Sequence, residues 1–308
     1  MALREQLPTP APAQLPAPPA PPEGPKPLIS VRHLRKVYRV GDEKVVALRD
    51  INLEIPRGQI VCIVGTSGSG KSTLLNQLAG LEKPTRGAVY IGKTNISQLS
   101  ENQLATFRQR HLGFIFQSYN LLPTMTALEN VALPMIFRGI SRGRRNKAAL
   151  SMLAAVGLKK RALHRPTEMS GGQQQRVGIA RAFVTRPKVV FADEPTGNLD
   201  TKTTIAVMKM MVRFARKYNQ TLIIVTHDPE LSDYADRIVT LIDGQIVHDQ
   251  MHTPIYDGEA APEPTQEPPA EPPDLSEMDL PLPDDPEEPQ AGQQAPDPTA
   301  EEGEESHE

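Results

Sequence analysis

Several features are scarce in this 308-residue chain, and each shortage excludes a class of protein. The single cysteine, Cys62, excludes an internal disulfide and a cysteine-based metal site. It lies between Val61 and Ile63, which indicates a buried core residue rather than a reactive thiol. No apolar run approaches the ~18 residues of a membrane-spanning helix, and the N-terminus lacks the apolar stretch of a secretory signal. We therefore expect a cytoplasmic protein that contacts a membrane only through a partner.

Prolines are scarce in the middle of the chain and abundant at both ends. Of 31 prolines, 10 lie in residues 1–27, 13 lie after His252, and only 8 lie between. Such ends cannot bury enough apolar surface to offset the entropy of ordering. We predict a disordered Pro/Ala-rich leader over residues 1–27, an ordered body over 28–250 and a disordered acidic tail over 251–308.

Basic residues are missing from the tail, which holds 18 acidic residues and no Lys or Arg. The body has 32 basic and 17 acidic residues, so its net charge is about +15. A basic body suits nucleotides, nucleic acid or an anionic membrane surface, and charge alone does not decide. The tail is either a solvated segment, an electrostatic cover for the body or a docking segment.

The body alternates buried strands with helical segments, which predicts an α/β layered fold. Residues 28–31 and 45–55 alternate apolar and polar side chains, as half-buried strands do. The runs 60–64, 189–192 and 222–225 are continuously apolar, which is typical of buried parallel strands. Residues 239–243 and 245–247 flank a turn at Gly244 and predict a closing hairpin.

A glycine-rich loop follows the strand over 60–64 and precedes a helix with leucines on one side. Its sequence matches the Walker A pattern in full and in the required strand–loop–helix context. The glycines let backbone N–H groups surround phosphate oxygens, and the helix N-terminus favours the same anions. Lys71 adds a positive charge at the β- and γ-phosphates, and the Ser72 hydroxyl is suited to ligate Mg²⁺. We predict a nucleotide site made by Gly65, Thr66, Ser67, Gly68, Ser69, Gly70, Lys71, Ser72 and Thr73.

Two carboxylates end the strand over 189–192. Lys188 to Glu194 reads KVVFADE, a Walker B element. We expect Asp193 to hold Mg²⁺ and Glu194 to accept a proton from the attacking water.

A second anion-binding helix start lies at Met169-Ser170-Gly171-Gly172-Gln173. It resembles the LSGGQ signature of ABC (ATP-binding cassette) ATPases, with Met169 in place of the usual leucine. Ser170 would cap the helix, and the amides of Gly171 and Gly172 would face a phosphate. The resemblance implies a head-to-tail homodimer in which the signature of one subunit, Ser170 to Gln173, closes over the ATP bound by the other.

Four further residues match motifs of this family in the expected order. The resemblance implies that Tyr38 stacks on adenine, that Gln117 reaches the metal and the water, that Asp200 lies in the loop touching the opposite subunit, and that His227 contacts the γ-phosphate. The implied cofactors are ATP and Mg²⁺, with Glu194, His227, Lys71 and Gln117 as catalytic residues and Ser72, Gln117 and Asp193 as metal ligands.

Residues 116–131 and 194–200 look like the ATPases of the macrolide-exporter, lipoprotein-release and cell-division group. The resemblance implies a P-loop NTPase core with a mostly parallel sheet, an antiparallel β subdomain and an inserted helical subdomain over about 102–169. It also implies an integral membrane permease, with an extracytoplasmic domain, that holds the ATPase at the inner face of the cell membrane. In that subdomain, Tyr119, Leu121, Leu122, Pro123 and Met125 either form a permease groove or belong to the core.

We expect an ATP-hydrolysing transporter subunit that performs export or mechanical work. The alternative is a soluble ABC ATPase acting on ribosomes or nucleic acid. It is disfavoured because translation-factor members usually carry two cassettes and DNA-repair members carry long coiled coils. No direct contact with nucleic acid is therefore expected.

Overall fold

The computed structural model describes residues 27–258. The predicted leader, apart from Pro27, and residues 259–308 of the predicted tail lie outside the described residues. Within 27–258 no helix has both the length and the apolar character needed to cross a bilayer.

A six-stranded sheet forms the centre of the fold, in the order β10-β9-β3-β8-β7-β6. Five strands run parallel, and β10 closes the edge as an antiparallel hairpin with β9. The inner strands β3, β7 and β8 are almost continuously buried, as a sheet covered on both faces requires. The strands are β3 (Ile60–Val64), β6 (Leu112–Phe116), β7 (Val189–Asp193), β8 (Thr221–Thr226), β9 (Arg237–Ile242) and β10 (Gln245–Met251).

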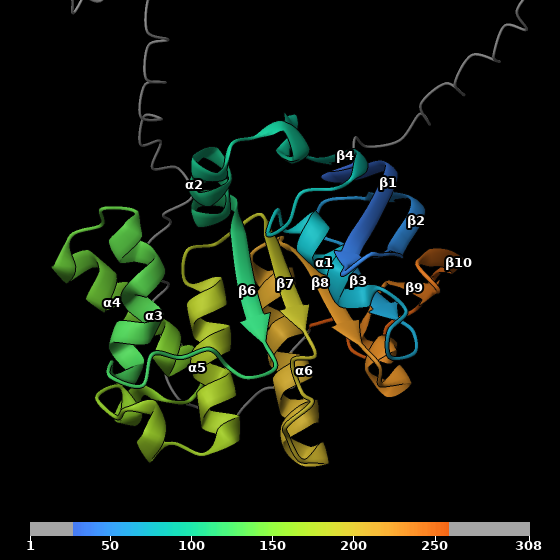
Figure 1. The fold of residues 1–308 in the computed structure, drawn as a ribbon. Helices are drawn as coiled ribbons and strands as arrows, with labels where there is room; N and C mark the ends of the chain where they lie inside the picture. Colours follow the sequence, from blue (N-terminus) through green and yellow to red (C-terminus); the bar gives the residue numbers. More distant parts are fainter. Residues whose placement is uncertain (1–26, 259–308) are drawn as a thin grey trace, which may run out of the picture. The chain divides into compact units, whose positions relative to one another are not determined.

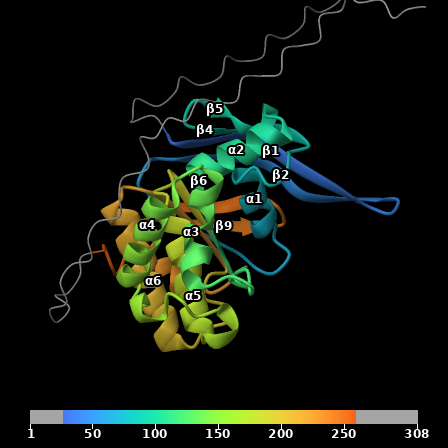
Figure 2. The same ribbon diagram turned by 90° about the vertical axis from the view of Figure 1, so that its left-hand side faces the viewer.

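A second sheet of four antiparallel strands packs beside the first, in the order β2-β1-β4-β5. It consists of β1 (Ile29–Val40), β2 (Glu43–Ile55), β4 (Arg86–Ile91) and β5 (Thr94–Asn95). Figure 2 shows the β1–β2 hairpin from the side. The inward residues of β1 and β2 join α1 and one face of β3, β7 and β8 in a single apolar core. The predicted mixed α/β architecture with an antiparallel sheet is therefore confirmed.

Helices cover the faces of the parallel sheet (Figure 1). Capping boxes begin two of them, where the Ser100 and Thr126 side chains bond to backbone N–H groups three residues on and the side chains of Gln103 and Glu129 bond back. The α-helices are α1 (Lys71–Leu78), α2 (Glu101–His111), α3 (Ala127–Phe137), α4 (Arg142–Ala155), α5 (Gly171–Phe183) and α6 (Thr201–Lys217).

The segment 102–169, predicted as a helical subdomain, contains α3, α4 and most of α2, but β6 lies within it. That strand pairs in parallel with β7 and belongs to the central sheet. Helices α3 and α4 pack against each other and against α5, and Figures 1 and 2 show the three together. The helical layer is thus attached to the parallel sheet through β6 and α5.

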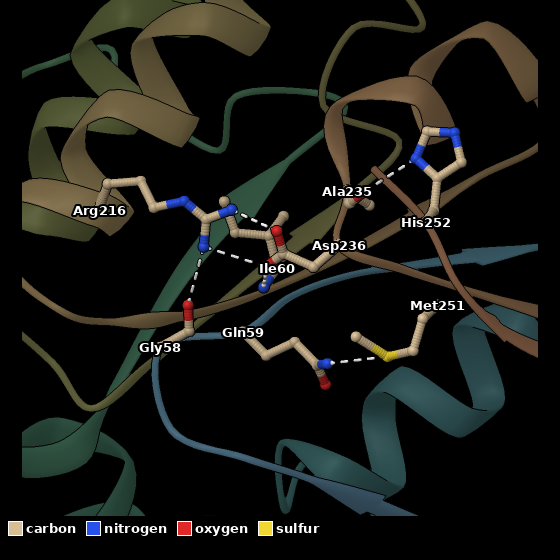
Figure 3. Close-up of polar contacts among 8 residues, drawn as sticks. All are labelled: Gly58, Gln59, Ile60, Arg216, Ala235, Asp236, Met251 and His252. Carbon is tan, nitrogen blue, oxygen red and sulfur yellow. Dashed lines mark hydrogen bonds and ion pairs between the residues drawn. The ribbon is translucent and has the colours of Figure 1, made fainter. Parts of the chain in front are cut away.

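The chain after β10 is fastened to the start of β9 (Figure 3). The His252 N–H donates to the Asp236 carbonyl at 2.7 Å, and its Nδ1 lies 3.1 Å from the Ala235 carbonyl oxygen. Asp236 in turn pairs with Arg216 of α6 and accepts the Ile60 N–H at 2.8 Å. Residues 251–258, the first of the predicted tail, therefore have defined contacts with the body.

Candidate active site

The loops that follow β3, β7 and β8 meet at one edge of the sheet. Val64 is paired with Thr226 and Asp193 with Val225, so these parallel strands end side by side. The next residues along the chain, Gly65, Glu194 and His227, therefore gather at the carboxyl edge, where open α/β sheets bind ligands. A cavity of about 480 Å³ lies there, lined by Val45, Val46, Ala47, Arg49, Ser67, Gly68, Gly70, Lys71, Ser72, Thr73, Glu194, His227, Asp243 and Gly244.

Lys71 is folded back over the glycine-rich loop. Its Nζ donates to the carbonyl oxygens of Gly65 and Thr66, both at 2.9 Å, and its side chain is buried. An ammonium group has three N–H donors, so two fix its position and the third can meet an anion in the cavity. The loop and Lys71 thus form a positive, donor-rich wall.

The antiparallel sheet supplies the opposite wall through a close backbone approach at Ala47. A Cβ added at Gly70 would lie 2.6 Å from the Ala47 carbonyl oxygen, and one at Gly244 would lie 2.5 Å from it. Gly70 also has a φ of 101°, which disfavours any residue with a side chain. Only glycine at both positions lets β2 close the cavity against the loop and the β9–β10 turn.

Asp193 faces the start of α1. The Ser72 hydroxyl donates to its Oδ1 at 3.5 Å. Burial, and then the neighbouring Glu194 carboxylate, raise the pKa of Asp193, whereas Ser72 and Lys71 oppose the rise. A hydroxyl and a carboxylate oxygen at this spacing suit the oxygen preference of Mg²⁺.

Glu194 is turned away from Asp193 by its backbone. Its φ of 46° lies in the left-handed region, and its N–H donates to the Val225 carbonyl at 2.9 Å. The carboxylate reaches the end of β8, where Thr226 Oγ1 donates to Oε2 at 3.2 Å and His227 Nδ1 lies 2.9 Å from Oε1. The structure therefore places a carboxylate and an imidazole together in the cavity, separate from the Asp193–Ser72 pair.

Gln117 lies directly after β6, beside the strand that carries Asp193. Its carbonyl accepts Asn198 Nδ2 at 3.1 Å, and its side-chain amide is close to Gly197. These contacts tie Gln117 to the loop before α6. Asp200 ends that loop as the N-cap of α6, accepting both the N–H and the hydroxyl of Thr203.

The signature residues lie outside the cavity that contains Lys71. Ser170 is exposed at the start of α5, and its N–H donates to Gln173 Oε1 at 3.2 Å. Gly171 faces the Tyr119 hydroxyl and Gly172 faces the Thr203 side chain. Residues 170–173 are absent from the cavity lining, although the structure describes all of them.

Tyr38 is held beside the site rather than in its lining. Its hydroxyl donates to Glu82 Oε2 at 2.7 Å, and Lys36 Nζ lies 5.0 Å from the ring centroid. Partial burial, and then Glu82, raise the pKa of Tyr38. The adenine contact of Tyr38 stays a prediction.

Several cavity residues were not predicted from the sequence. Val45, Val46, Ala47 and Arg49 come from β2, and Asp243 and Gly244 come from the β9–β10 turn. The Arg49 Nε–H donates to the Asp243 carbonyl at 3.2 Å, joining the two segments. No local motif marks such contacts. Thr226, which donates to Glu194, was also not predicted, but its position beside His227 could have indicated it.

Known proteins resemble this chain closely. The ABC transporter family matches residues 48–197. An uncharacterized ABC transporter ATP-binding protein of Methanocaldococcus jannaschii is 50% identical over 220 residues, 71% of this chain and 98% of that protein. The lipoprotein-releasing system ATP-binding protein LolD of Geobacter metallireducens is 46% identical over 222 residues, 72% of this chain and 99% of LolD.

A longer relative and a solved structure extend the comparison. The macrolide export ATP-binding/permease protein MacB of Burkholderia pseudomallei is 44% identical over 237 residues, 77% of this chain but only 36% of MacB. A dimeric structure of the ATP-binding cassette MJ0796, in a post-hydrolysis state with ADP and Pi, is 40% identical, with a TM-score of 0.68 over 72% of this chain and 98% of that one. These matches show that the chain belongs to the ABC transporter ATP-binding proteins and is an ABC-type ATP hydrolase.

Proposed function

We propose that this ATPase drives a separate membrane permease through a head-to-tail homodimer with two composite sites. The proposal rests on the separation of the signature, residues 170–173, from the cavity of its own chain. Lys71, Glu194 and His227 share one cavity, while Ser170 faces outward on α5. A signature that cannot serve the cavity of its own chain can serve that of a second copy, and MJ0796 has been solved as a dimer.

Within each site, the loop 65–73 binds the phosphates of ATP through its backbone N–H groups and Lys71. The oxygens of Ser72 and Asp193, with Gln117 from the loop after β6, would hold Mg²⁺. The ion would offset the charge that develops on the phosphates. Tyr38 would stack on the adenine ring.

Glu194 accepts a proton from the attacking water, and His227 orients this carboxylate and contacts the γ-phosphate. Ser170, Gly171, Gly172 and Gln173 of the second copy complete the site. Asp200, at the start of α6, lies in the loop proposed to touch that copy.

The permease would dock on the apolar cavity between α2, β6, α3 and α5. This cavity measures about 610 Å³, and its lining includes Leu81, Phe114, Leu133, Pro134 and Phe137. The Phe137 side chain is 67% exposed. The lining includes Asn120. It contains none of the five residues that the sequence offered as a permease groove, Tyr119, Leu121, Leu122, Pro123 and Met125.

The likeness to MacB and LolD supports export or mechanical work, with the ATPase at the inner face of the cell membrane and a permease that carries an extracytoplasmic domain. LolD is named as an ATP-binding protein without a permease part, and its likeness supports a permease on a separate chain.

The proposal is tested by affinity purification of the tagged full chain from the membrane fraction. We expect an integral membrane protein to co-purify and to be lost in Phe137→Asp. The control Leu163→Asp, at a side chain 76% exposed and outside the cavity lining, should retain it. Recovery of ribosomes or nucleic acid in place of a membrane protein would contradict the permease reading.

A further inference from the structure

Helix α6 presents a strongly basic surface. It contains five Lys or Arg residues, and no Asp or Glu occurs from Thr201 to His227. Its apolar side is buried against the core, which leaves cations on the outer side. Arg216 is turned inward to Asp236. We call Arg186, Lys209, Arg213 and Lys217 the α6 basic surface.

Arg186 joins this surface although it precedes β7. Its guanidinium lies 4.9 Å from the centroid of the Tyr218 ring, and Lys217 Nζ lies 5.6 Å from the same centroid. Two cations therefore lie against the same Tyr218 ring at the end of α6. Like charges gathered in this way favour a polyanion.

The last described residues of the chain lie along this surface. The Ile255 N–H donates to the Asp233 carbonyl at 2.8 Å, which fixes the path after β10. The Tyr256 ring centroid lies 5.6 Å from Lys209 Nζ. A Cβ added at Gly258 would lie 2.9 Å from Arg216 Cγ and 3.6 Å from Arg213 Cα. The chain therefore contacts α6 immediately before the acidic segment begins.

The segment that follows has the complementary charge. Residues 259–273 contain four Glu residues and no Lys or Arg. We propose that this acidic segment binds the α6 basic surface of its own chain.

The attachment at Tyr256 and Gly258 makes such binding intramolecular. A short tether gives an effective concentration on the order of millimolar, so individually weak contacts suffice. One exposed ion pair contributes little by itself, and several would act together here. Exposed pairs are screened by salt, so the association should weaken as ionic strength rises.

Zero-length carbodiimide cross-linking of the full chain tests the proposal, because it joins a carboxylate to a lysine amine that it touches. We expect bonds from carboxylates of 259–273 to Lys209 and Lys217, falling several-fold between about 0.02 and 0.5 M salt. The control sites are Lys44 of β2 and Lys93 of the β4–β5 turn, which are also exposed. Equal cross-linking of all four lysines would overturn the proposal.

A charge variant removes the dependence on any single lysine. Arg213→Glu with Lys217→Glu should lower cross-linking at Lys209 several-fold, whereas Lys44→Glu with Lys93→Glu should not change it. Thermal unfolding of both variants verifies that they fold. Mixing isotope-labelled and unlabelled protein distinguishes cross-links within one chain from cross-links between two chains. Cross-links found only between labelled and unlabelled copies would show that the acidic segment of a second chain binds the surface, which would contradict the proposal. Unchanged cross-linking at Lys209 in the first variant would also refute the proposal.

Discussion

His227 Nδ1 lies 2.9 Å from Glu194 Oε1, although the two residues follow different strands. The contact depends on the left-handed backbone at Glu194, where φ is 46°. Thr226 occupies the other carboxylate oxygen at 3.2 Å. The Glu194 carboxylate is therefore oriented from two sides, as a general base must be to meet a water molecule.

Glu194→Gln should bind ATP but hydrolyse it slowly. The amide keeps the shape of the side chain and loses its ability to accept a proton, which typically costs ~10²–10⁴-fold in rate. The variant should also accumulate as an ATP-bound dimer, because the closed state is no longer removed by hydrolysis. Phosphate release and size-exclusion chromatography with ATP measure the two effects.

Glu230→Gln is the matched control for this experiment. Glu230 is exposed three residues after His227 and does not line the cavity. Its substitution should leave hydrolysis unchanged. Near-wild-type hydrolysis by Glu194→Gln would show that the role proposed for Glu194 is wrong.

Asp236→Ala should destabilise the fold by about 1–3 kcal/mol, because it leaves the Ile60 N–H and the Arg216 guanidinium without their carboxylate. Figure 3 shows both contacts converging on Asp236. Asp249 pairs with Arg237 and is more exposed than Asp236. Asp249→Ala should therefore lower the free energy of unfolding by about 1 kcal/mol or less. Urea unfolding compares the two variants, and equal losses would contradict the importance given to Asp236.

His111 should make stability depend on pH. Burial, and then Lys188, Arg138 and Arg110, lower the pKa of His111 from 6.5 to about 4. Between these values the unfolded chain binds more protons than the folded chain, so the free energy of unfolding should decrease as pH falls from 6.5 towards 4.

His111→Gln should make that decrease shallower. Urea unfolding at pH 7 and pH 5 gives the stability difference for each protein, and NMR titration of the imidazole gives its pKa. A His111 imidazole that titrates near pH 6.5 in the folded protein would refute this explanation.

The parts of the site that are continuous in sequence could be predicted from it. The glycine-rich loop, Asp193–Glu194 and His227 each follow a strongly apolar strand, and parallel strands bring their carboxyl ends together. Strands β3, β7 and β8 were found for the same reason, because a run of buried β-branched residues leaves little choice of structure.

Long-range contacts could not be predicted in this way. The approach of Ala47 to Gly70 and Gly244 joins segments far apart in the chain and leaves no local pattern beyond the glycines themselves. Likewise, β6 was not predicted from the sequence, because Gly113 interrupts its short apolar run between α2 and α3. An added Cβ at Gly113 would lie 2.5 Å from the Ala182 carbonyl oxygen. Glycine is therefore required there by the close packing of α5 on β6, which is known only once the fold is known.

The central claim, that each site needs two chains, is tested most directly by mixing two inactive variants. Lys71→Ala removes the ammonium of one half-site. Ser170→Asp retains a good N-cap oxygen for α5 but places a negative charge towards the phosphates. A mixed dimer has one site with both defects and one site with neither. An equal mixture should therefore regain about a quarter of wild-type hydrolysis through random pairing, while each variant alone stays inactive. Hydrolysis by the mixture no faster than the mean of the two variants would contradict the composite site.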